Sequence, residues 1–300
     1  MYLKLLISDI IKTMSNNVFS DFAEKQRPDN PQEMLKNNFY FSGLMAEEMS
    51  CSIIRRVNHH PRGHYFTVDI TVTNADKNLL TEVNSTVMSN RGLITPVKGA
   101  YNLSARGKSK VQIVLDFLEG HPILVGDLAK NRIEIMKIAL KYLNNFRGHK
   151  FHKQKSEEMD KLRGKLRGIK ISGTIDQIFD LSTTDQDSLG YFFAGVIDGE
   201  GSFGVKSSGL YKQPFFAIAM KDKKIIELLR KFIDHGNVRL RKDGAYHLEI
   251  NHRTILRNVC DIFLNQYPLK HQRQRKRLLI LQQLLNDYTP KSLGLVTQRI

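Results

Sequence analysis

Residues 191–203 read Tyr191-Phe192-Phe193-Ala194-Gly195-Val196-Ile197-Asp198-Gly199-Glu200-Gly201-Ser202-Phe203, an apolar run that ends at two acids set among glycines. The run is far shorter than the ~20 apolar residues of a membrane span, so it predicts a helix buried against protein. Its small residues leave one face on which the backbone of a second helix can approach closely. Glycines on both sides of Glu200 allow a sharp helix exit, which places this carboxylate at the helix end.

A carboxylate at the C-terminal end of a helix faces the negative end of the helix dipole. A second such helix beside the first would bring another acid to the same place. A bound cation offsets both penalties, and carboxylate oxygens suit Mg²⁺ or Ca²⁺. The plainer alternative is a core helix followed by a solvated Gly-Glu-Gly turn.

The segment Ala194–Phe203 resembles the LAGLIDADG motif of homing endonucleases in a Gly-Glu-Gly-Ser-Phe form. A second copy lies upstream, because residues 39–51 align with residues 191–203 without gaps. In this alignment the two motif acids, Glu48 and Glu200, coincide. The first copy departs from the second at two positions, with Ala46 opposite Asp198 and Met49 opposite Gly201.

The same order of elements, α-β-β-α-β-β-α-α, is predicted for both halves, with the motif helix as the first element. The first copy is followed by strands 52–58, 65–74, 92–97 and 100–105 and helices 76–88, 108–118 and 127–142. The second is followed by strands 202–206 and 215–220, a hairpin at 237–250, and helices 223–232, 253–264 and 271–287. This is the order of LAGLIDADG half-domains. The resemblance implies an α+β fold of two pseudo-symmetric αββαββα half-domains, each a curved four-stranded antiparallel sheet covered by helices, packed through the two motif helices.

The predicted organisation has five parts. An N-terminal extension covers residues 1–37, and the half-domains cover 38–145 and 188–288. A linker at 146–187 joins them, and its mixed-charge stretch 153–167 predicts a solvated helix. Residues 289–300 form a C-terminal tail.

The composition favours a polyanionic partner, since 46 Lys and Arg residues against 30 Asp and Glu residues give a net charge of +16 and a pI of about 9.7. Nucleic acid is the first such partner and an anionic membrane surface the second. No segment is apolar enough to span a bilayer. The two cysteines, Cys51 and Cys260, are far apart and lack paired spacing, so neither a disulfide framework nor a zinc site is indicated.

The resemblance implies a DNA endonuclease that hydrolyses phosphodiester bonds of both strands at a long, weakly symmetric site. It also implies Mg²⁺ bound by Glu48 and Glu200, with Mn²⁺ or Ca²⁺ able to occupy the same sites. The family places a basic residue after the late Pro-Leu element, and the second half offers Lys270 and Arg273 there. The first half offers only Lys130, for which the spacing favours a helix-surface role. Glu47 lies one position out of register and is expected to be solvated or bound to basic neighbours.

Two larger sets of residues are predicted to make contacts. Close packing of the motif helices is expected to involve the small residues Ser42, Gly43, Ala46, Ala194, Gly195 and Gly199. Double-stranded DNA is expected on the polar faces and turns of the two sheets, where arginines can read guanine and lysines meet phosphates. These residues are Arg56, Asn58, Thr67, Asp69, Thr71, Lys98, Lys206, Lys212, Arg239, Arg241 and His247. The plainer alternative is a solvated sheet face.

Other functions fit the same scaffold. The departures at Ala46 and Met49 favour an intron RNA maturase or a cleavage-dead DNA-binding protein, and more weakly a nicking enzyme. A single chain with both motif copies predicts a monomer that needs no membrane. The resemblance implies a mitochondrion or chloroplast as the compartment only through where such genes usually occur.

Overall fold

The computed structural model describes residues 35–57, 64–145, 153–169, 185–208 and 211–287. By its contacts the chain divides into Met1–Asn37 and Asn38–Ile300, and the fold described below belongs to the second part. Nearly all of the connection between the predicted strands 52–58 and 65–74 and nearly all of the N-terminal extension lie outside the described residues, as does the C-terminal tail.

The first half begins with its motif helix, α4 (Phe39–Glu48). Four antiparallel strands and three helices follow, and the sheet has the strand order β1-β2-β4-β3. These elements are β1 (Met49–Val57), β2 (His64–Asn74), α5 (Lys77–Thr86), β3 (Leu93–Val97), β4 (Ala100–Arg106), α6 (Lys108–Gly120) and α7 (Asp127–Asn144).

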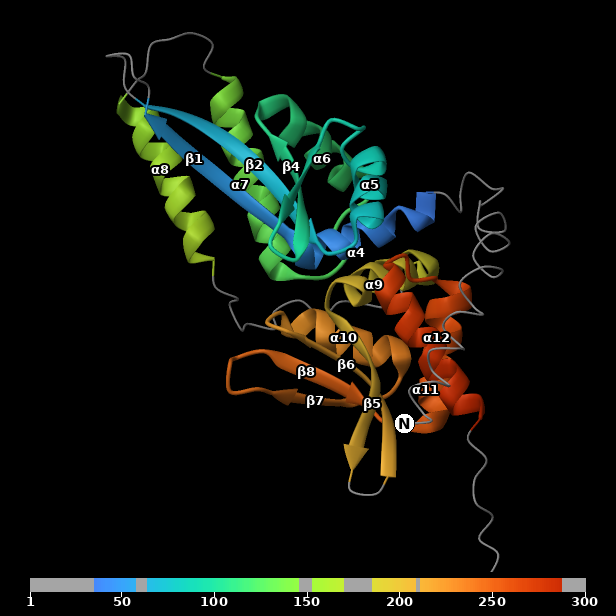
Figure 1. Ribbon diagram of the computed structural model, residues 1–300. Helices are drawn as coiled ribbons and strands as arrows, with labels where there is room; N and C mark the ends of the chain where they lie inside the picture. The colour runs from blue at the N-terminus through green and yellow to red at the C-terminus, as the bar shows by residue number, and fades with distance from the viewer. Residues whose placement is uncertain (1–34, 58–63, 146–152, 170–184, 209–210, 288–300) are drawn as a thin grey trace, which may run out of the picture. The chain divides into compact units, whose positions relative to one another are not determined.

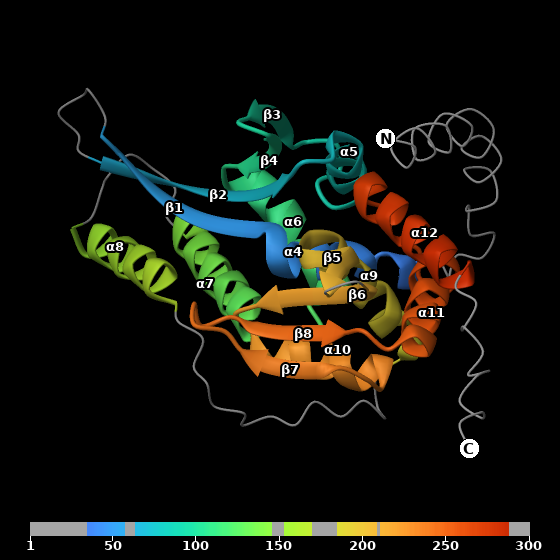
Figure 2. The same ribbon diagram turned by 60° about the horizontal axis from the view of Figure 1, so that its bottom comes forward.

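The second half repeats this arrangement after its motif helix, α9 (Gln186–Glu200), and its sheet has the order β5-β6-β8-β7. Its elements are β5 (Gly201–Ser208), β6 (Tyr211–Met220), α10 (Lys223–Ile233), β7 (Asn237–Leu240), β8 (Tyr246–Ile250), α11 (Arg253–Asp261), a short π-helical segment (Ile262–Gln266) and α12 (Gln272–Asn286). Figure 1 and Figure 2 show the two sheets, each with helices packed against it. The predicted α+β class and the repeated half-domain are therefore confirmed.

Alternation along the strands separates a dry face from a polar face in each sheet. In β2, Val68, Ile70 and Val72 are buried beneath the helices, whereas Thr67 and Thr71 on the opposite face are partly exposed. In β6, Phe216, Ile218 and Met220 are buried in the same way. Each half therefore keeps one sheet face free of its own core.

The linker helix differs from the prediction. Helix α8 (Lys153–Gly168) forms, but it is not simply solvated, because it packs on β1 and α7. Met159 and Leu162 are buried in this contact, and Asp160 forms an ion pair with Arg55 of β1 at 3.0 Å. The buried face needs few apolar residues, Met159 and Leu162 with the partly buried Leu166, which is why the composition of the helix indicated solvent exposure.

Two local details complete the fold. Asp76 is the N-cap of α5, since its carboxylate accepts from the amides of Asn78 and Leu79. Strand β7 ends at Leu240, which is exposed, so Arg241 lies in the turn that follows. Among the described residues, no helix has the length and apolar character needed to cross a membrane.

Candidate active site and nucleic-acid interface

The two motif helices pack backbone against backbone at a pair of equivalent glycines. A Cβ atom added at Gly43 would lie 1.9 Å from the carbonyl oxygen of Phe192, and one added at Gly195 would lie 1.9 Å from that of Tyr40. Contacts this short leave no room for any side chain, and side-chain size sets how closely helices approach. Ala46 and Ala194 are buried on these helices, and Ser42 is buried with its hydroxyl donating to the His121 carbonyl at 2.6 Å.

This packing brings the two motif acids to the ends of adjacent helices. Glu48 is the last residue of α4 and Glu200 the last of α9. A Cβ added at Gly199 would lie 3.6 Å from Oε1 of Glu48, so the Glu48 carboxylate lies against the end of the opposite motif helix. Met49 and Gly201, which follow the acids, both have extended backbone and start the first strand of their sheet.

The carboxyl groups of this pair, those of Glu48 and Glu200, both have raised pKa values. Burial, and then the charge of Glu200, raise the pKa of Glu48 to about 7, while a 3.3 Å hydrogen bond from the Asn74 amide acts in the opposite direction. Glu200 as a residue is exposed, yet partial desolvation of its carboxyl group still raises its pKa. Two like charges on one site favour protonation unless a cation is bound.

Glu47 adds a third carboxylate, and it is half-buried rather than solvated. It stands where the second motif has Gly199, and a Cβ at Gly199 would touch the Cβ of Glu47 at 3.5 Å. Burial raises the pKa of Glu47 to about 8, with further increases from the charges of Glu200, Asp222 and Glu48. The Arg132 guanidinium lowers the pKa of Glu47, as expected for the basic neighbour that the sequence suggested.

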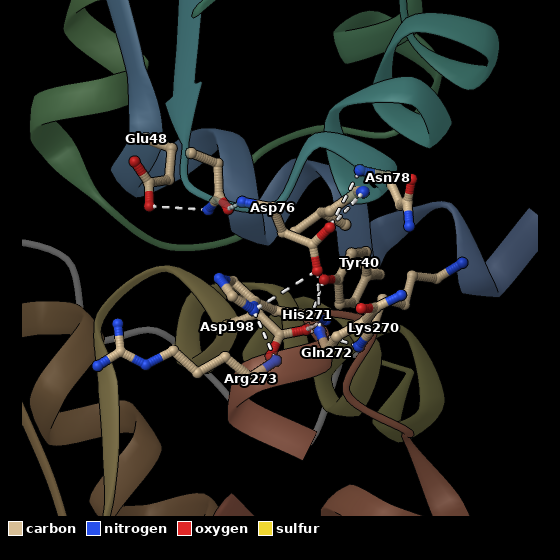
Figure 3. A network of polar contacts seen from close by, with 11 residues as sticks. Tyr40, Glu48, Asp76, Asn78, Asp198, Lys270, His271, Gln272 and Arg273 are labelled. Carbon is tan, nitrogen blue, oxygen red and sulfur yellow. Dashed lines mark hydrogen bonds and ion pairs between the residues drawn. The ribbon is translucent and has the colours of Figure 1, made fainter. Parts of the chain in front are cut away.

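The other motif acid, Asp198, holds the start of α12. Its Oδ2 accepts hydrogen bonds from the Tyr40 hydroxyl at 2.6 Å and from the backbone amides of Lys270 and His271 at 2.6 and 2.9 Å. Figure 3 shows this network at the junction of the two halves. Burial raises the pKa of Asp198 to about 7 against the effect of these hydrogen bonds. Ala46, at the equivalent position of the first half, has no carboxylate with which to hold the start of α7 in this way.

The two basic residues predicted for the second half have different surroundings. The Lys270 ammonium pairs with Glu82 of the first half at 3.0 Å and lies 5.4 and 5.0 Å from the ring centroids of Tyr40 and Phe41. Arg273 is exposed, and in Figure 3 its guanidinium extends away from the hydrogen-bonded network with no partner drawn. Of the two, Arg273 is the side chain available to a ligand.

In the first half, the Lys130 ammonium donates to the Leu124 carbonyl at 2.8 Å. This side chain of α7 is therefore hydrogen-bonded to the loop just before its own helix. Arg132 was not predicted as a site residue, yet its guanidinium donates to the carbonyl of Met49 at 3.2 Å, directly after Glu48. Gln274 of α12 makes the corresponding contact to the carbonyl of Gly201 in the second half. Their positions early in α7 and α12 are the only sequence signal for this role.

The polar sheet faces carry most of the predicted DNA-contacting residues. In the first sheet Arg56 and Lys98 are exposed, and the Thr71 hydroxyl lies 3.1 Å from that of Ser104. Asp69 is buried, and its carboxylate accepts two hydrogen bonds from Arg106, so it reaches a ligand only if this pair opens. Asn58 lies outside the described residues.

In the second sheet a charged cluster connects three strands. Lys206 of β5 pairs with Glu249 of β8, and Arg239 of β7 lies 3.5 Å from Glu249 and donates to His247 at 3.3 Å. Arg241 pairs with Asp243 in the adjoining turn at 3.0 Å. Lys212 lies on β6, opposite Ser207 of β5, and its side chain is outside the described residues.

The donor set fits a cation that shares its ligands with a substrate. No group of three or more His, Cys, Asp or Glu side chains in the described ranges could hold a metal ion. Glu48 and Glu200 contribute two carboxyl groups whose pKa values are raised, chiefly by burial. A hard divalent cation takes about six oxygen ligands, so water and a phosphate oxygen would have to complete its shell.

Fold and site together define the class. Residues 193–283 match the family model described as LAGLIDADG endonuclease, which confirms the resemblance over the second half. The first half lies outside this match, as its departures at Ala46 and Met49 would suggest. No curated protein sequence matches the chain.

Solved structures extend the fold to both halves. The chain is similar to the LAGLIDADG homing endonuclease I-GzeII in complex with its DNA target, with a TM-score of 0.68 and 17% identity over 83% of this chain and 89% of that one. It is similar to I-LtrWI bound to target DNA (TM-score 0.68, 18% identity, 84% of this chain and 90% of that one). It is also similar to I-SmaMI bound to uncleaved DNA in the presence of calcium ions, with a TM-score of 0.67 and 17% identity over 84% of this chain and 94% of that one. The chain therefore has the two-domain LAGLIDADG endonuclease fold.

Proposed function

We propose that this protein is a site-specific DNA endonuclease that uses divalent metal to cut both strands of a long, weakly symmetric target. The observation that carries the proposal is the meeting of Glu48 and Glu200 at the ends of two helices whose contact admits no side chain. The family match of the second half and the DNA complexes of similar structures support it.

Three sets of residues have separate roles in this proposal: metal binding, charge neutralisation and DNA positioning. Glu48 and Glu200 would hold the metal, which when bound would polarise a phosphate and activate water. The exposed guanidinium of Arg273 can neutralise charge that develops on a phosphate in the second half. The polar faces of the sheets, with exposed Arg56 and Arg239 among them, would position the duplex. With both half-sites in one chain, we infer that the protein acts as a monomer.

Cleavage by purified protein tests this function. A plasmid library carrying randomised or native-locus sites is incubated with Mg²⁺, and linear products are sequenced. Wild-type protein is expected to give linear DNA at one site. The Glu48→Gln and Glu200→Gln variants are expected to give none, while Glu119→Gln, an exposed acid on α6, is expected to cut normally. Tight DNA binding without cleavage under any metal would contradict the proposal.

A second candidate, a nicking enzyme, is favoured by the inequality of the two halves. In the first half Lys130 and Arg132 are both engaged with backbone carbonyls, and Glu47 stands where the second half has Gly199. An endonuclease with one impaired half-site converts supercoiled plasmid to the open circle faster than the open circle to linear product. Strand-specific end labelling of the product distinguishes this candidate from double-strand cleavage.

A further inference from the structure

An arginine-lined cavity lies beside the first sheet, among β1, α7 and α8. Its volume is about 310 Å³, and its cationic lining consists of Arg55, Arg132, Arg163 and Arg167. Strand β1 is an edge of its sheet, and α8 packs along it, as Figures 1 and 2 show. The cavity thus depends on the linker helix, and of its arginines Arg132 also contacts the backbone next to Glu48.

Positive charge in this cavity is only partly balanced. None of the lining residues is acidic. The one carboxylate in contact with the lining arginines is that of Asp160, which lies 3.0 Å from Arg55 and 3.7 Å from Arg163 in the described ranges. Arg132 is held at one end by the Met49 carbonyl, which is a neutral partner. Asp160 is thus the acid paired with Arg55 and Arg163, and Glu47 is an acid that Arg132 affects from a greater distance.

One donor in the cavity has no acceptor at all. The Nε atom of Arg163 is buried and makes no hydrogen bond. Buried polar groups in folded proteins almost always have a partner, and a buried charged donor without one is costly. The orphaned Nε, in a cavity that carries excess positive charge, indicates a missing anion rather than a packing defect.

The chemistry of the lining selects among anions. Guanidinium groups are planar forks that bind phosphate oxygens in pairs, and several of them around one hollow suit a group with several acceptor oxygens. The backbone of β1 from Ser50 to Arg55 forms one wall of the cavity. We propose that this cavity binds a phosphate group.

The cavity is distinct from the sheet surface on which DNA is expected. Arg55 reaches α8 and Asp160, whereas its neighbour Arg56 lies on the opposite, polar face of β1 by strand alternation. The phosphate can come from a polynucleotide that crosses the edge of β1 or from a small phosphate compound. Neither source requires that the protein cleave DNA, so this proposal stands apart from the catalytic one.

Binding of the group itself is measured first. Full-length, metal-free protein is titrated with inorganic phosphate and pyrophosphate by calorimetry, together with Arg167→Gln and an Arg163→Gln/Arg167→Gln double variant. Arg167 is exposed, so its single variant should fold normally. Arg230→Gln is the matched control, because Arg230 forms a comparable i,i+3 helix pair with Glu227 at 3.3 Å, away from the cavity.

A second measurement identifies the source. Affinity for a non-target duplex is followed across a salt series, where each lost phosphate contact lowers the slope of log K against log salt by about 0.9. A slope reduced by one or two such steps in the double variant supports a polynucleotide phosphate. An unchanged slope with pyrophosphate affinity reduced about tenfold or more supports a small phosphate compound. If neither quantity differs from that of Arg230→Gln, the proposal is wrong.

Discussion

Asp76 and Asp222 occupy equivalent positions in the two halves, and each uses one carboxylate to cap helices from both. One oxygen of Asp76 accepts from the first turn of α5, and the other accepts from the Gln272 amide of α12 at 2.9 Å. Asp222 caps α10 through the Lys224 amide, and its other oxygen accepts from the Asp127 amide of α7 at 2.7 Å. The halves are thus joined by a reciprocal exchange of helix caps as well as by their motif helices.

Removing either shared cap should cost more than removing an ordinary one. Loss of a single N-cap destabilises a protein by about 1 kcal/mol, so Asp76→Ala and Asp222→Ala, which each remove two, are expected to cost about 2 kcal/mol. This corresponds to a decrease in Tm of about 4–8 °C for a domain of this size. Thermal unfolding followed by circular dichroism measures it.

The control for this prediction is Asp116→Ala. Asp116 lies on the exposed face of α6 and accepts only from Gln112 within its own helix. Its replacement should change the free energy of unfolding by a few tenths of a kcal/mol. Equal effects of Asp76→Ala and Asp116→Ala would mean that the cross-half cap contributes nothing.

The glycine pair at the motif-helix contact should tolerate no substitution. Gly43→Ala or Gly195→Ala places a Cβ 1.9 Å from a carbonyl oxygen of the opposite helix, so the helices must separate. We expect loss of soluble folded protein or of the cooperative transition. Gly164→Ala in α8 is the matched control, because nothing lies within 4 Å of its added Cβ. This control should gain about 0.5–1 kcal/mol from reduced backbone entropy. Normal stability of Gly195→Ala would show that the helices are not packed as described.

Much of this site could be predicted from the sequence, because it depends on the alignment of the two motif copies and on the local periodicity of helices and strands. Aligning the two motif copies placed Glu48 opposite Glu200 and Gly43 opposite Gly195, and strand alternation separated core from polar sheet faces. These inferences need only helix and strand periodicity. They could therefore be made before any tertiary contact was known.

Contacts that depend on tertiary packing, including those between the two halves, could not be predicted from periodicity. The second oxygen of Asp76 and the guanidinium of Arg132 acquire their roles from residues distant in sequence, Gln272 and Met49. Burial of Asp69 against Arg106 breaks the rule that an alternating polar residue is accessible. In each case the role depends on how whole elements rotate against one another, which periodicity does not specify.

Metal affinity should rise with pH through the range in which the site carboxylates ionise. The pKa of Glu48 is raised to about 7 and that of Glu47 to about 8, and a carboxylate must lose its proton to bind a cation. Calorimetric titration with Ca²⁺ is expected to show weaker binding at pH 6 than at pH 8. Glu47→Gln removes the group whose pKa is about 8, so the dependence that remains should lie at lower pH, where Glu48 ionises. An unchanged profile would mean that Glu47 does not act on the site.

Stability of the metal-free protein should show the opposite trend. A carboxylate whose pKa is raised on folding binds its proton more tightly in the folded state. Its contribution to stability is therefore full below its unfolded pKa and is lost as pH rises through the folded value, here between pH 4.5 and about 8. The Tm of Glu48→Gln relative to wild type should rise across this window, and added Ca²⁺ should reduce the difference. A constant difference from pH 5 to pH 8 would contradict the pKa assignment.

Alanine variants of Arg273 and Lys270 should distinguish a residue needed for cleavage from one needed for stability in the second half. Arg273 is exposed and has no partner in Figure 3, so Arg273→Ala should leave the Tm within about 1 °C and reduce cleavage of one strand by about 10²-fold. Lys270 pairs with Glu82 and lies over two aromatic rings, so Lys270→Ala should lower the Tm and affect cleavage less. Strand-specific single-turnover cleavage and thermal unfolding measure the two effects, with the exposed Lys276→Ala as the control. If Lys270→Ala abolishes cleavage without a change in Tm while Arg273→Ala cuts normally, the two roles are reversed.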